Sequence, residues 1–337
     1  MKSIGFTHSL PIDDEQSLFE FDAPMPSPGA RDLLVEIRAI SVNPADAKRR
    51  KRTAVDKPHE QPLVLGYDAV GVVTKIGSDV TLFEVGDEVW YAGDATRPGS
   101  NTEFQLVDER IVGPKPKSLS NAEAAAMPLT GLTSWEMLFD RFGIHEGDGE
   151  GQSLLVIGGA GGVGSLTIQL ARKLTKLKII ATASRPETVA WCKEMGAHDV
   201  VDHRDLVADM KAKGYSSVDY ITQYANTSQH WDAMCELVAP QGKIGTIVET
   251  PEPVNISKLQ AKSVSLHWEL MFTRAMFQTA DMAEQNKILT RMSELVDAGT
   301  LRTTHKQTLN GFSAETLKEA HRRIETATLI GKLVVEY

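Results

Sequence analysis

The segment SLLVIGGAGGVGSLTIQLARKLTKLKIIATASR, which spans residues 153–185, decides the fold of this chain. It reads as a buried strand, a glycine-rich turn, a helix and a second strand, and the turn has the spacing G-x-G-x-x-G. In this context the spacing is typical of dinucleotide binding, because glycines let the backbone approach a pyrophosphate at the positive end of a helix. We therefore predict that the loop binds a cofactor through Gly159, Gly161, Gly162, Val163 and Gly164.

The residues at the end of the second strand distinguish the two nicotinamide cofactors. NAD-selective enzymes usually carry an Asp or Glu there, about 20 residues after the glycine loop, to bind the ribose 2′-hydroxyl. This chain carries Ser184 and Arg185, which would accept a 2′-phosphate. Ser184 could also cap a helix beginning at Pro186, and the two roles can coexist. The sequence thus predicts NADPH as cofactor, bound in part by Ser184 and Arg185.

The composition is that of an ordinary globular protein. Of 337 residues, 42% are hydrophobic and 24% are charged, and the formal net charge is −9. This acidic balance argues against a general binder of nucleic acid or anionic membranes. No run approaches the ~20 apolar residues of a membrane-spanning helix, and the first residues do not have the pattern of a signal peptide. With only Cys192 and Cys235 present, we expect no disulfide framework and a reducing, cytoplasmic location.

Two different patterns divide the chain. In the first part, short strand-like runs alternate with turn residues, which predicts a small β-barrel-like domain. From residue 153 strands and helices alternate, which predicts a doubly wound α/β fold with a parallel sheet and helices on both faces. The expected strands are 33–40, 69–76, 88–91 and 102–107 in the first part, and 153–157, 178–183, 199–202, 218–222, 243–248 and 263–268 in the second.

Motifs spread over the whole chain accompany the glycine loop. They are SVNPAD at 41–46, GYDAVGVV at 66–73, VGDEV at 85–89, AAMPLTGLTS at 125–134 and GKLV at 331–334. Together they resemble the medium-chain dehydrogenase/reductase superfamily, and within it the quinone-oxidoreductase-like branch that is often named zinc-type alcohol dehydrogenase-like.

The resemblance implies an organisation and further site residues. It implies a GroES-like catalytic domain at 1–125, a Rossmann domain for NADP(H) at 126–270, and a segment at 271–337 that returns to the catalytic domain. It also implies a homodimer. Thr130 lies in a segment that packs near the nicotinamide in such proteins, and we expect Thr130 and Lys332 to bind cofactor.

Zinc-dependent relatives have metal ligands that this chain lacks. They carry a Cys where this chain has Asn43, a Gly-His-Glu where it reads Gly66-Tyr67-Asp68, and a third ligand where it offers Met127-Pro128. Zinc needs three or four N, S or O ligands in a tetrahedral array. We therefore expect no metal.

The lack of zinc restricts the chemistry. Hydride delivery to a simple ketone produces an alkoxide, which zinc would stabilise as a Lewis acid. Delivery to a quinone or an α,β-unsaturated carbonyl produces a delocalised phenolate or enolate, whose negative charge requires less stabilisation by the protein. We therefore expect these substrates, with Tyr67 or Asn43 polarising the acceptor oxygen and Tyr67 or water supplying the proton.

Other interpretations remain open on the sequence alone. Tyr67 could merely pack against cofactor or substrate. The chain could be an alcohol dehydrogenase that holds metal through unusual ligands, or a weakly catalytic NADPH-binding regulator that binds RNA. The basic run Lys48–Arg52 is the only support for RNA binding, and we expect it to be a solvated helix face instead.

Overall fold

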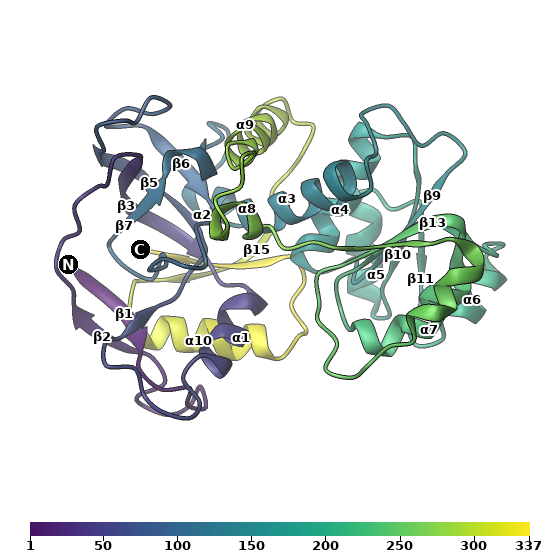
Figure 1. Cartoon of the computed structure of the whole chain (residues 1–337), viewed down its shortest axis with the longest axis horizontal. Helices are drawn as coiled ribbons and strands as arrows, with labels where there is room; N and C mark the ends of the chain where they lie inside the picture. Colours follow the sequence, from purple (N-terminus) through teal and green to yellow (C-terminus); the bar gives the residue numbers. More distant parts are fainter. The chain divides into compact units, whose positions relative to one another are not determined.

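A computed structural model describes all 337 residues, and these divide into two units (Figure 1). Unit 1 comprises Met1–Leu129 and Phe272–Tyr337, and unit 2 comprises Thr130–Met271. The structural boundaries follow residues 129 and 271, where the sequence led us to expect 125 and 270. The C-terminal segment therefore belongs to the same unit as the N-terminal one.

Unit 2 is built around a six-stranded sheet in which all neighbouring strands are parallel. The inner strands are buried because helices cover both faces of such a sheet, and Leu154, Leu155, Val156 and Ile157 of the first strand are all 0% exposed. This confirms the predicted doubly wound sheet. The edge strand Ser265–Trp268 is largely exposed. In sheet order the strands are β11 (Asp199–Val201), β10 (Lys178–Thr182), β9 (Ser153–Ile157), β12 (Val218–Gln223), β13 (Val238–Thr246) and β14 (Ser265–Trp268).

The helices of unit 2 connect these strands. On one face, Leu155, Ile180 and Ile221 pack in a common core with Trp231 and Met234. The helical elements are α3 (Pro128–Trp135), which crosses the boundary between the units, the π-helical η2 (Glu136–Arg141), α4 (Gly162–Leu174), α5 (Pro186–Met195), α6 (Leu206–Ala212), α7 (Thr227–Leu237) and the 3₁₀ segment η3 (Ile256–Lys262).

One helix start differs from the sequence expectation. Helix α5 begins at Pro186 as predicted, but its N-cap residue is Arg185 and not Ser184. The Arg185 backbone N–H donates to the Thr188 hydroxyl at 3.1 Å, so a side chain from the first turn satisfies this end of the helix. Ser184 therefore does not have the capping role that we considered for it.

Unit 1 contains a seven-stranded sheet and a smaller three-stranded sheet. The last strand of the chain pairs antiparallel with β3, with Val334 opposite Ser41, which joins the C-terminal segment to the first part of the chain. The large sheet has the order β15 (His305–Asn310), β16 (Lys332–Glu336), β3 (Asp32–Ser41), β5 (Asp68–Ile76), β6 (Glu88–Tyr91) and β8 (Val112–Pro114), with β7 (Phe104–Asp108) also paired to β3. The small sheet consists of β2 (Phe19–Asp22), β1 (Lys2–Phe6) and β4 (Leu63–Val64).

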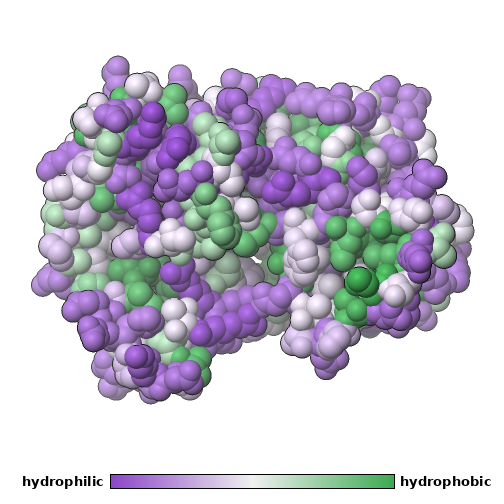
Figure 2. All heavy atoms as spheres, in the orientation of Figure 1, coloured by the Kyte–Doolittle hydropathy of each residue, from purple (hydrophilic) through white to green (hydrophobic).

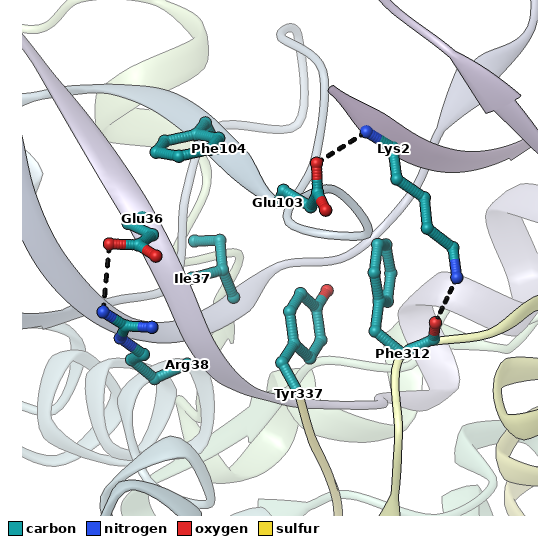
Figure 3. Close-up of a pocket in the computed structure, with 8 residues that line it drawn as sticks. All are labelled: Lys2, Glu36, Ile37, Arg38, Glu103, Phe104, Phe312 and Tyr337. Carbon is teal, nitrogen blue, oxygen red and sulfur yellow. Dashed lines mark hydrogen bonds and ion pairs between the residues drawn. The ribbon is translucent and has the colours of Figure 1, made fainter.

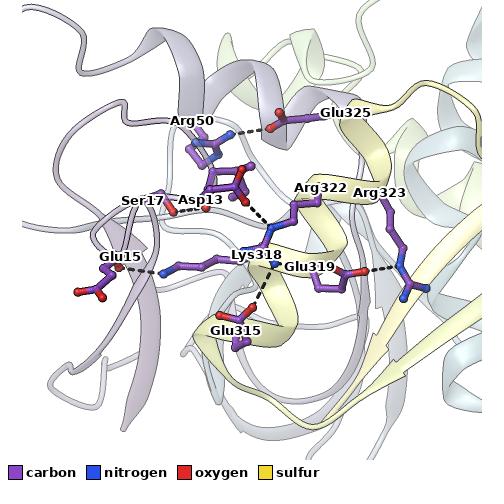
Figure 4. A network of polar contacts seen from close by, with 11 residues as sticks. Asp13, Glu15, Ser17, Arg50, Glu315, Lys318, Glu319, Arg322, Arg323 and Glu325 are labelled. Carbon is purple, nitrogen blue, oxygen red and sulfur yellow. Dashed lines mark hydrogen bonds and ion pairs between the residues drawn. The ribbon is translucent and has the colours of Figure 1, made fainter.

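The helices of unit 1 include the one that carries the basic run. These elements are α1 (Pro44–Arg52), η1 (Glu109–Ile111), α2 (Asn121–Ala125), α8 (Thr273–Met276), α9 (Glu284–Asp297) and α10 (Ala314–Glu325). Helix α1 contacts α10, and there Arg50 is 0% exposed and pairs with Glu325 at 2.6 Å (Figure 4). The expectation that the basic run is a solvated face is therefore wrong for Arg50. Its charge is compensated inside the protein, whereas Lys51 and Arg52 are exposed.

The surface is mixed. Hydrophilic residues cover much of the visible face, with apolar areas between them (Figure 2). No helix has both the length and the apolar character required to cross a membrane. Cys192 and Cys235 are both buried free thiols, so no disulfide links them.

Candidate functional site

The glycine loop of unit 2 has one glycine at which a side chain would meet no clash. Gly158 has φ +89°, which only glycine adopts easily, and a Cβ on Gly159 would lie 2.8 Å from that of Ala181. A Cβ on Gly164 would overlap the carbonyl oxygen of Gly158. These three glycines are therefore needed for the turn itself. At Gly161, by contrast, the nearest atom would be 3.6 Å away, so its lack of a side chain leaves room for a ligand.

The helix after this loop presents an uncapped N-terminus. Gly161 is the N-cap of α4 and offers no side-chain hydrogen bond, and the first turn carries no acidic residue. The backbone N–H groups of Gly162, Val163 and Gly164 belong to this first turn and have no partner within the helix. Thr182 fixes the loop, because its hydroxyl accepts from Gly158 N at 3.0 Å. This cradle fits the pyrophosphate of a dinucleotide.

Ser184 and Arg185, the residues predicted to bind the 2′-phosphate, directly follow β10 in the chain. The Arg185 side chain is 44% exposed and lies 3.3 Å from Glu187. Ser184 is half-buried. Strand β10 is the neighbour of β9, so both residues lie at the carboxyl edge of the sheet, where open α/β folds bind their ligands. Their role in binding a 2′-phosphate stays a prediction.

A hydroxyl network, which sequence reasoning missed, joins α3 to the glycine-loop helix. The Ser134 hydroxyl lies 2.8 Å from the Thr130 carbonyl oxygen and 3.0 Å from that of Val163. Thr167 then connects Ser134 to Tyr224, at 3.0 and 2.9 Å. Thr130 itself is 3% exposed. The network places Thr130 beside the loop that we expect to bind cofactor.

The other predicted site residues converge in unit 1 around the carboxylate of Asp68. Asp68 is 0% exposed and accepts four hydrogen bonds. Its Oδ2 accepts from Ser41 Oγ and Asn43 Nδ2, both at 2.9 Å, and from Lys332 Nζ at 3.2 Å. Its Oδ1 accepts from the Leu129 backbone N–H at 2.7 Å. The buried negative charge is thus fully compensated.

Asn43 and Lys332 are largely occupied by these internal contacts. Both amide protons of Asn43 are used, on Asp68 and on the Ser41 carbonyl oxygen at 3.2 Å, and Asn43 Oδ1 accepts from Lys332. Asn43 therefore has no proton left to polarise a substrate unless one of these bonds breaks. Lys332 is 4% exposed and retains one of its three ammonium protons for a further partner such as the cofactor.

Asp46 supports the same cluster from α1. Its carboxylate accepts from the backbone N–H groups of Asn43 at 2.8 Å and of Gly66 at 3.0 Å. Burial raises the pKa of Asp46 to about 7, although these two N–H groups and the nearby Lys332 act in the opposite direction. Asp46 therefore fixes the loop geometry through backbone contacts.

These residues do not fit a zinc ion. The cluster offers neither a thiolate nor an imidazole, which are the usual zinc ligands. The lone pairs of Asp68 are taken by four donors, and those of Asp46 face backbone N–H groups. The ammonium of Lys332 already supplies the positive charge. The residues of this cluster therefore do not provide a ligand set for zinc.

Tyr67 is a second site residue of unit 1, besides Lys332, that keeps an available proton. It is 6% exposed, and its ring centroid lies 4.5 Å from that of Phe272. Its hydroxyl accepts from Arg49 Nη1 at 3.5 Å. Since a guanidinium can only donate, the Tyr67 proton is not used by this contact. Burial raises the pKa of Tyr67, Asp46 raises it further, and Arg49 opposes both.

A buried carboxylate pair in unit 2 also escaped the sequence analysis. Glu136 begins the π-helical η2, and Glu269 directly follows β14; they are 0% and 2% exposed. Arg141 Nε lies 2.7 Å from Glu269 and its Nη2 lies 3.5 Å from Glu136. Burial and the charge of Glu136 raise the pKa of Glu269 to about 9, so it holds a proton at neutral pH. Single acidic residues inside apolar segments gave no motif by which to find this pair.

A pocket of about 350 Å³ in unit 1 lies among other residues (Figure 3). Its charged side chains already have partners: Lys2 donates to the Phe312 carbonyl oxygen at 2.6 Å, and Arg38 pairs with Glu36 at 3.0 Å. Phe312 and Tyr337 stack with ring centroids 4.2 Å apart. None of the predicted site residues lines this pocket.

Two family models match parts of this chain. Residues 29–117 match the model of the alcohol dehydrogenase GroES-like domain, and residues 195–335 match that of the zinc-binding dehydrogenase. The two units and these matches define a medium-chain dehydrogenase/reductase, which is an oxidoreductase. Within that superfamily, the chain belongs to the zinc-type alcohol dehydrogenase-like family.

Relatives match over nearly the entire chain. The zinc-type alcohol dehydrogenase-like protein of Staphylococcus epidermidis is 42% identical over 99% of both chains. The human mitochondrial NAD(P)H oxidoreductase RTN4IP1 is 29% identical over 90% of this chain and 81% of its own. A solved structure of a putative zinc-dependent alcohol dehydrogenase from Rhizobium etli has a TM-score of 0.94 and 47% identity, covering 100% of this chain and 98% of that one. Escherichia coli quinone oxidoreductase, solved with NADPH, shares the fold with a TM-score of 0.82, 22% identity and full coverage of both chains.

Proposed function

We propose that this protein is an NADPH-dependent reductase of quinones or α,β-unsaturated carbonyls that works without zinc. The observation that carries the proposal is the pairing of an available phenol proton on Tyr67 with a cluster whose charge comes from Lys332 instead of a metal. Such a site can protonate or polarise an oxygen but offers no Lewis acid, which suits an acceptor whose negative charge delocalises.

Different residues of this chain bind the cofactor and supply the proton. NADPH, when bound, supplies a hydride to the β-carbon of an enone or to a quinone. The N–H groups of Gly162, Val163 and Gly164 bind its pyrophosphate, and Ser184 and Arg185 receive the 2′-phosphate. The Tyr67 hydroxyl donates a hydrogen bond to the acceptor oxygen and then its proton, and water reprotonates the phenolate.

The names of related proteins support this proposal. Escherichia coli quinone oxidoreductase was solved with NADPH, and CurK, which shares the fold at 21% identity and a TM-score of 0.82, is an enoyl reductase. The human relative is named an NAD(P)H oxidoreductase. The RNA-binding alternative loses support, because Arg50 of the basic run is buried against Glu325.

A substrate panel tests the proposal. The loss of NADPH absorbance is followed with 1,4-naphthoquinone, 1-octen-3-one and cyclohexanone, with NADH run in parallel. We expect turnover of the quinone or the enone and a preference for NADPH. Turnover of cyclohexanone alone, lost on treatment with a chelator, would instead support a metal-dependent alcohol dehydrogenase. A preference for NADH would contradict the roles of Ser184 and Arg185.

A further inference from the structure

The basic run Lys48–Arg52 has no role in the function proposed so far. Its members have different partners although they are consecutive on α1. Arg50 and Lys51 both pair with Glu325 of α10, at 2.6 and 2.8 Å, and Figure 4 shows the first of these contacts. These two cations therefore serve the packing of α1 against α10.

Arg49 has a different environment from its neighbours. Its Nη1 donates to the carbonyl oxygen of Ala95, which fixes the guanidinium, and the same nitrogen lies 3.5 Å from the Tyr67 hydroxyl. Because Arg49 can only donate, it takes a lone pair of the Tyr67 oxygen and leaves the phenol proton free for another acceptor. The Tyr67 ring also packs against the Phe272 ring, with the two ring centroids 4.5 Å apart.

We propose that Arg49 is a positioning residue that orients the Tyr67 hydroxyl toward the substrate and stabilises the phenolate left after proton transfer. This inference rests on the proposed function. In the step itself, the O–H bond of Tyr67 breaks and its proton bonds to the oxygen of the enolate or hydroquinone anion made by hydride transfer. The negative charge then lies on the Tyr67 oxygen, next to the guanidinium, until water returns a proton.

The other charged groups around Tyr67 make the contribution of Arg49 important. Asp46, also on α1, raises the pKa of Tyr67, as does burial. Asp68 is adjacent in sequence but is compensated by Lys332 of β16, which also acts on Asp46. Phe272 adds no charge. Arg49 is thus the group that favours the phenolate, against burial and Asp46.

A double-mutant cycle tests the coupling. The variants are Arg49→Met, Arg49→Lys, Tyr67→Phe and the double variant Arg49→Met/Tyr67→Phe, assayed with the best substrate of the panel above. Arg49→Met should lower kcat by about tenfold, which is a fraction of the roughly 10²–10⁴-fold that general acid catalysis contributes, with a smaller effect on KM. Arg49→Lys should recover part of the rate. In the Tyr67→Phe background, Arg49→Met should cause no further loss, because the two residues act as a unit. Arg52→Met, an exposed cation on the same helix, is the matched control.

A second measurement does not depend on turnover. With tyrosine labelled at ¹³Cζ, the resonance of Tyr67 is identified by its absence in Tyr67→Phe and followed as pH rises. Removing Arg49 should move the onset of Tyr67 ionisation to higher pH, and Arg52→Met should not. Unchanged ionisation in Arg49→Met, or rate losses that simply add in the cycle, would overturn the proposal. If the wild-type protein reduces none of the panel, the proposed function fails, while the resonance still decides whether Arg49 acts on Tyr67.

Discussion

At the scale of single residues, the glycine loop separates structural glycines from the one that leaves space for a ligand. Gly164 is packed so closely that any side chain would meet the Gly158 carbonyl oxygen, whereas a Cβ on Gly161 would come no closer than 3.6 Å to another atom. The sequence motif has glycine at both positions and does not distinguish their roles. Only the structure assigns one to the turn and the other to the approach of a ligand.

This difference gives a matched pair of variants. Gly161→Ala should fold with a stability within about 1 kcal/mol of the wild type, since the Gly161 φ of −74° suits alanine. It should nevertheless weaken NADPH binding by about tenfold or more, because the methyl group occupies the space of the pyrophosphate. Gly164→Ala should lower the melting temperature as well. Cofactor titration by fluorescence and thermal unfolding measure the two effects, and equal NADPH affinity in Gly161→Ala and wild type would contradict the assignment.

At the scale of elements, the carboxylate pair formed by η2 and the end of β14 links the stability of unit 2 to pH. In the folded protein the pKa of Glu269 is raised to about 9 from an ordinary value of 4.5. The folded state therefore binds more protons than the unfolded state between these values. The contribution of Glu269 to the stability of the folded state is fully present below pH 4.5 and is lost as pH rises through about 9.

Glu269→Gln should remove this dependence. The wild-type free energy of unfolding should fall between pH 5 and pH 9, by at most about 1.4 kcal/mol per pH unit for one proton, and the variant should show a flatter profile. Urea unfolding at several pH values measures it. Glu150→Gln, whose side chain is 84% exposed in the wild type, is the control. The same slope in Glu269→Gln and wild type would show that Glu269 does not hold the proton.

The elements also show what sequence patterns can and cannot predict. Five of the six parallel strands of unit 2 were predicted to within two residues of their observed limits, because apolar runs between glycine and proline residues indicate strands. Strand β13 instead begins at Val238, five residues before the predicted start at 243. The N-cap of α5 and the burial of Arg50 were not predicted. The burial of Arg50 depends on Glu325 at the far end of the chain, which the local sequence does not specify. The N-cap of α5 depends on a local contact, in which the Thr188 hydroxyl accepts from the Arg185 backbone N–H, and a Ser preceding the helix does not indicate it.

At the scale of the whole molecule, the sheet of unit 2 ends in an exposed edge strand. Strand β14 is an edge strand, and Leu266 and Trp268 on it are 37% and 54% exposed. An exposed, apolar edge strand readily pairs with another chain. We therefore propose that the protein forms a homodimer through β14.

A charge on this edge should prevent the dimer. Trp268→Asp should shift the protein toward a monomer in size-exclusion chromatography with light scattering, because an unpaired charge would be buried in the interface. Leu82→Asp, at an equally exposed apolar position in unit 1, should leave the assembly unchanged. A wild-type protein that is monomeric at micromolar concentration would contradict the dimer.

By itself the sequence determined the class of fold, the glycine loop and the absence of thiolate and imidazole ligands at the expected metal positions. These features are local, since each depends on residue types at fixed spacing. The tertiary structure decided which of the predicted residues can act. It brought Lys332 from the end of the chain to Asp68 and to the amide oxygen of Asn43, and it placed the amide protons of Asn43 on Asp68 and the Ser41 carbonyl oxygen. It left the proton of Tyr67 available beside Arg49. The contacts of Lys332 join residues far apart along the chain, and they form only when β16 pairs with β3.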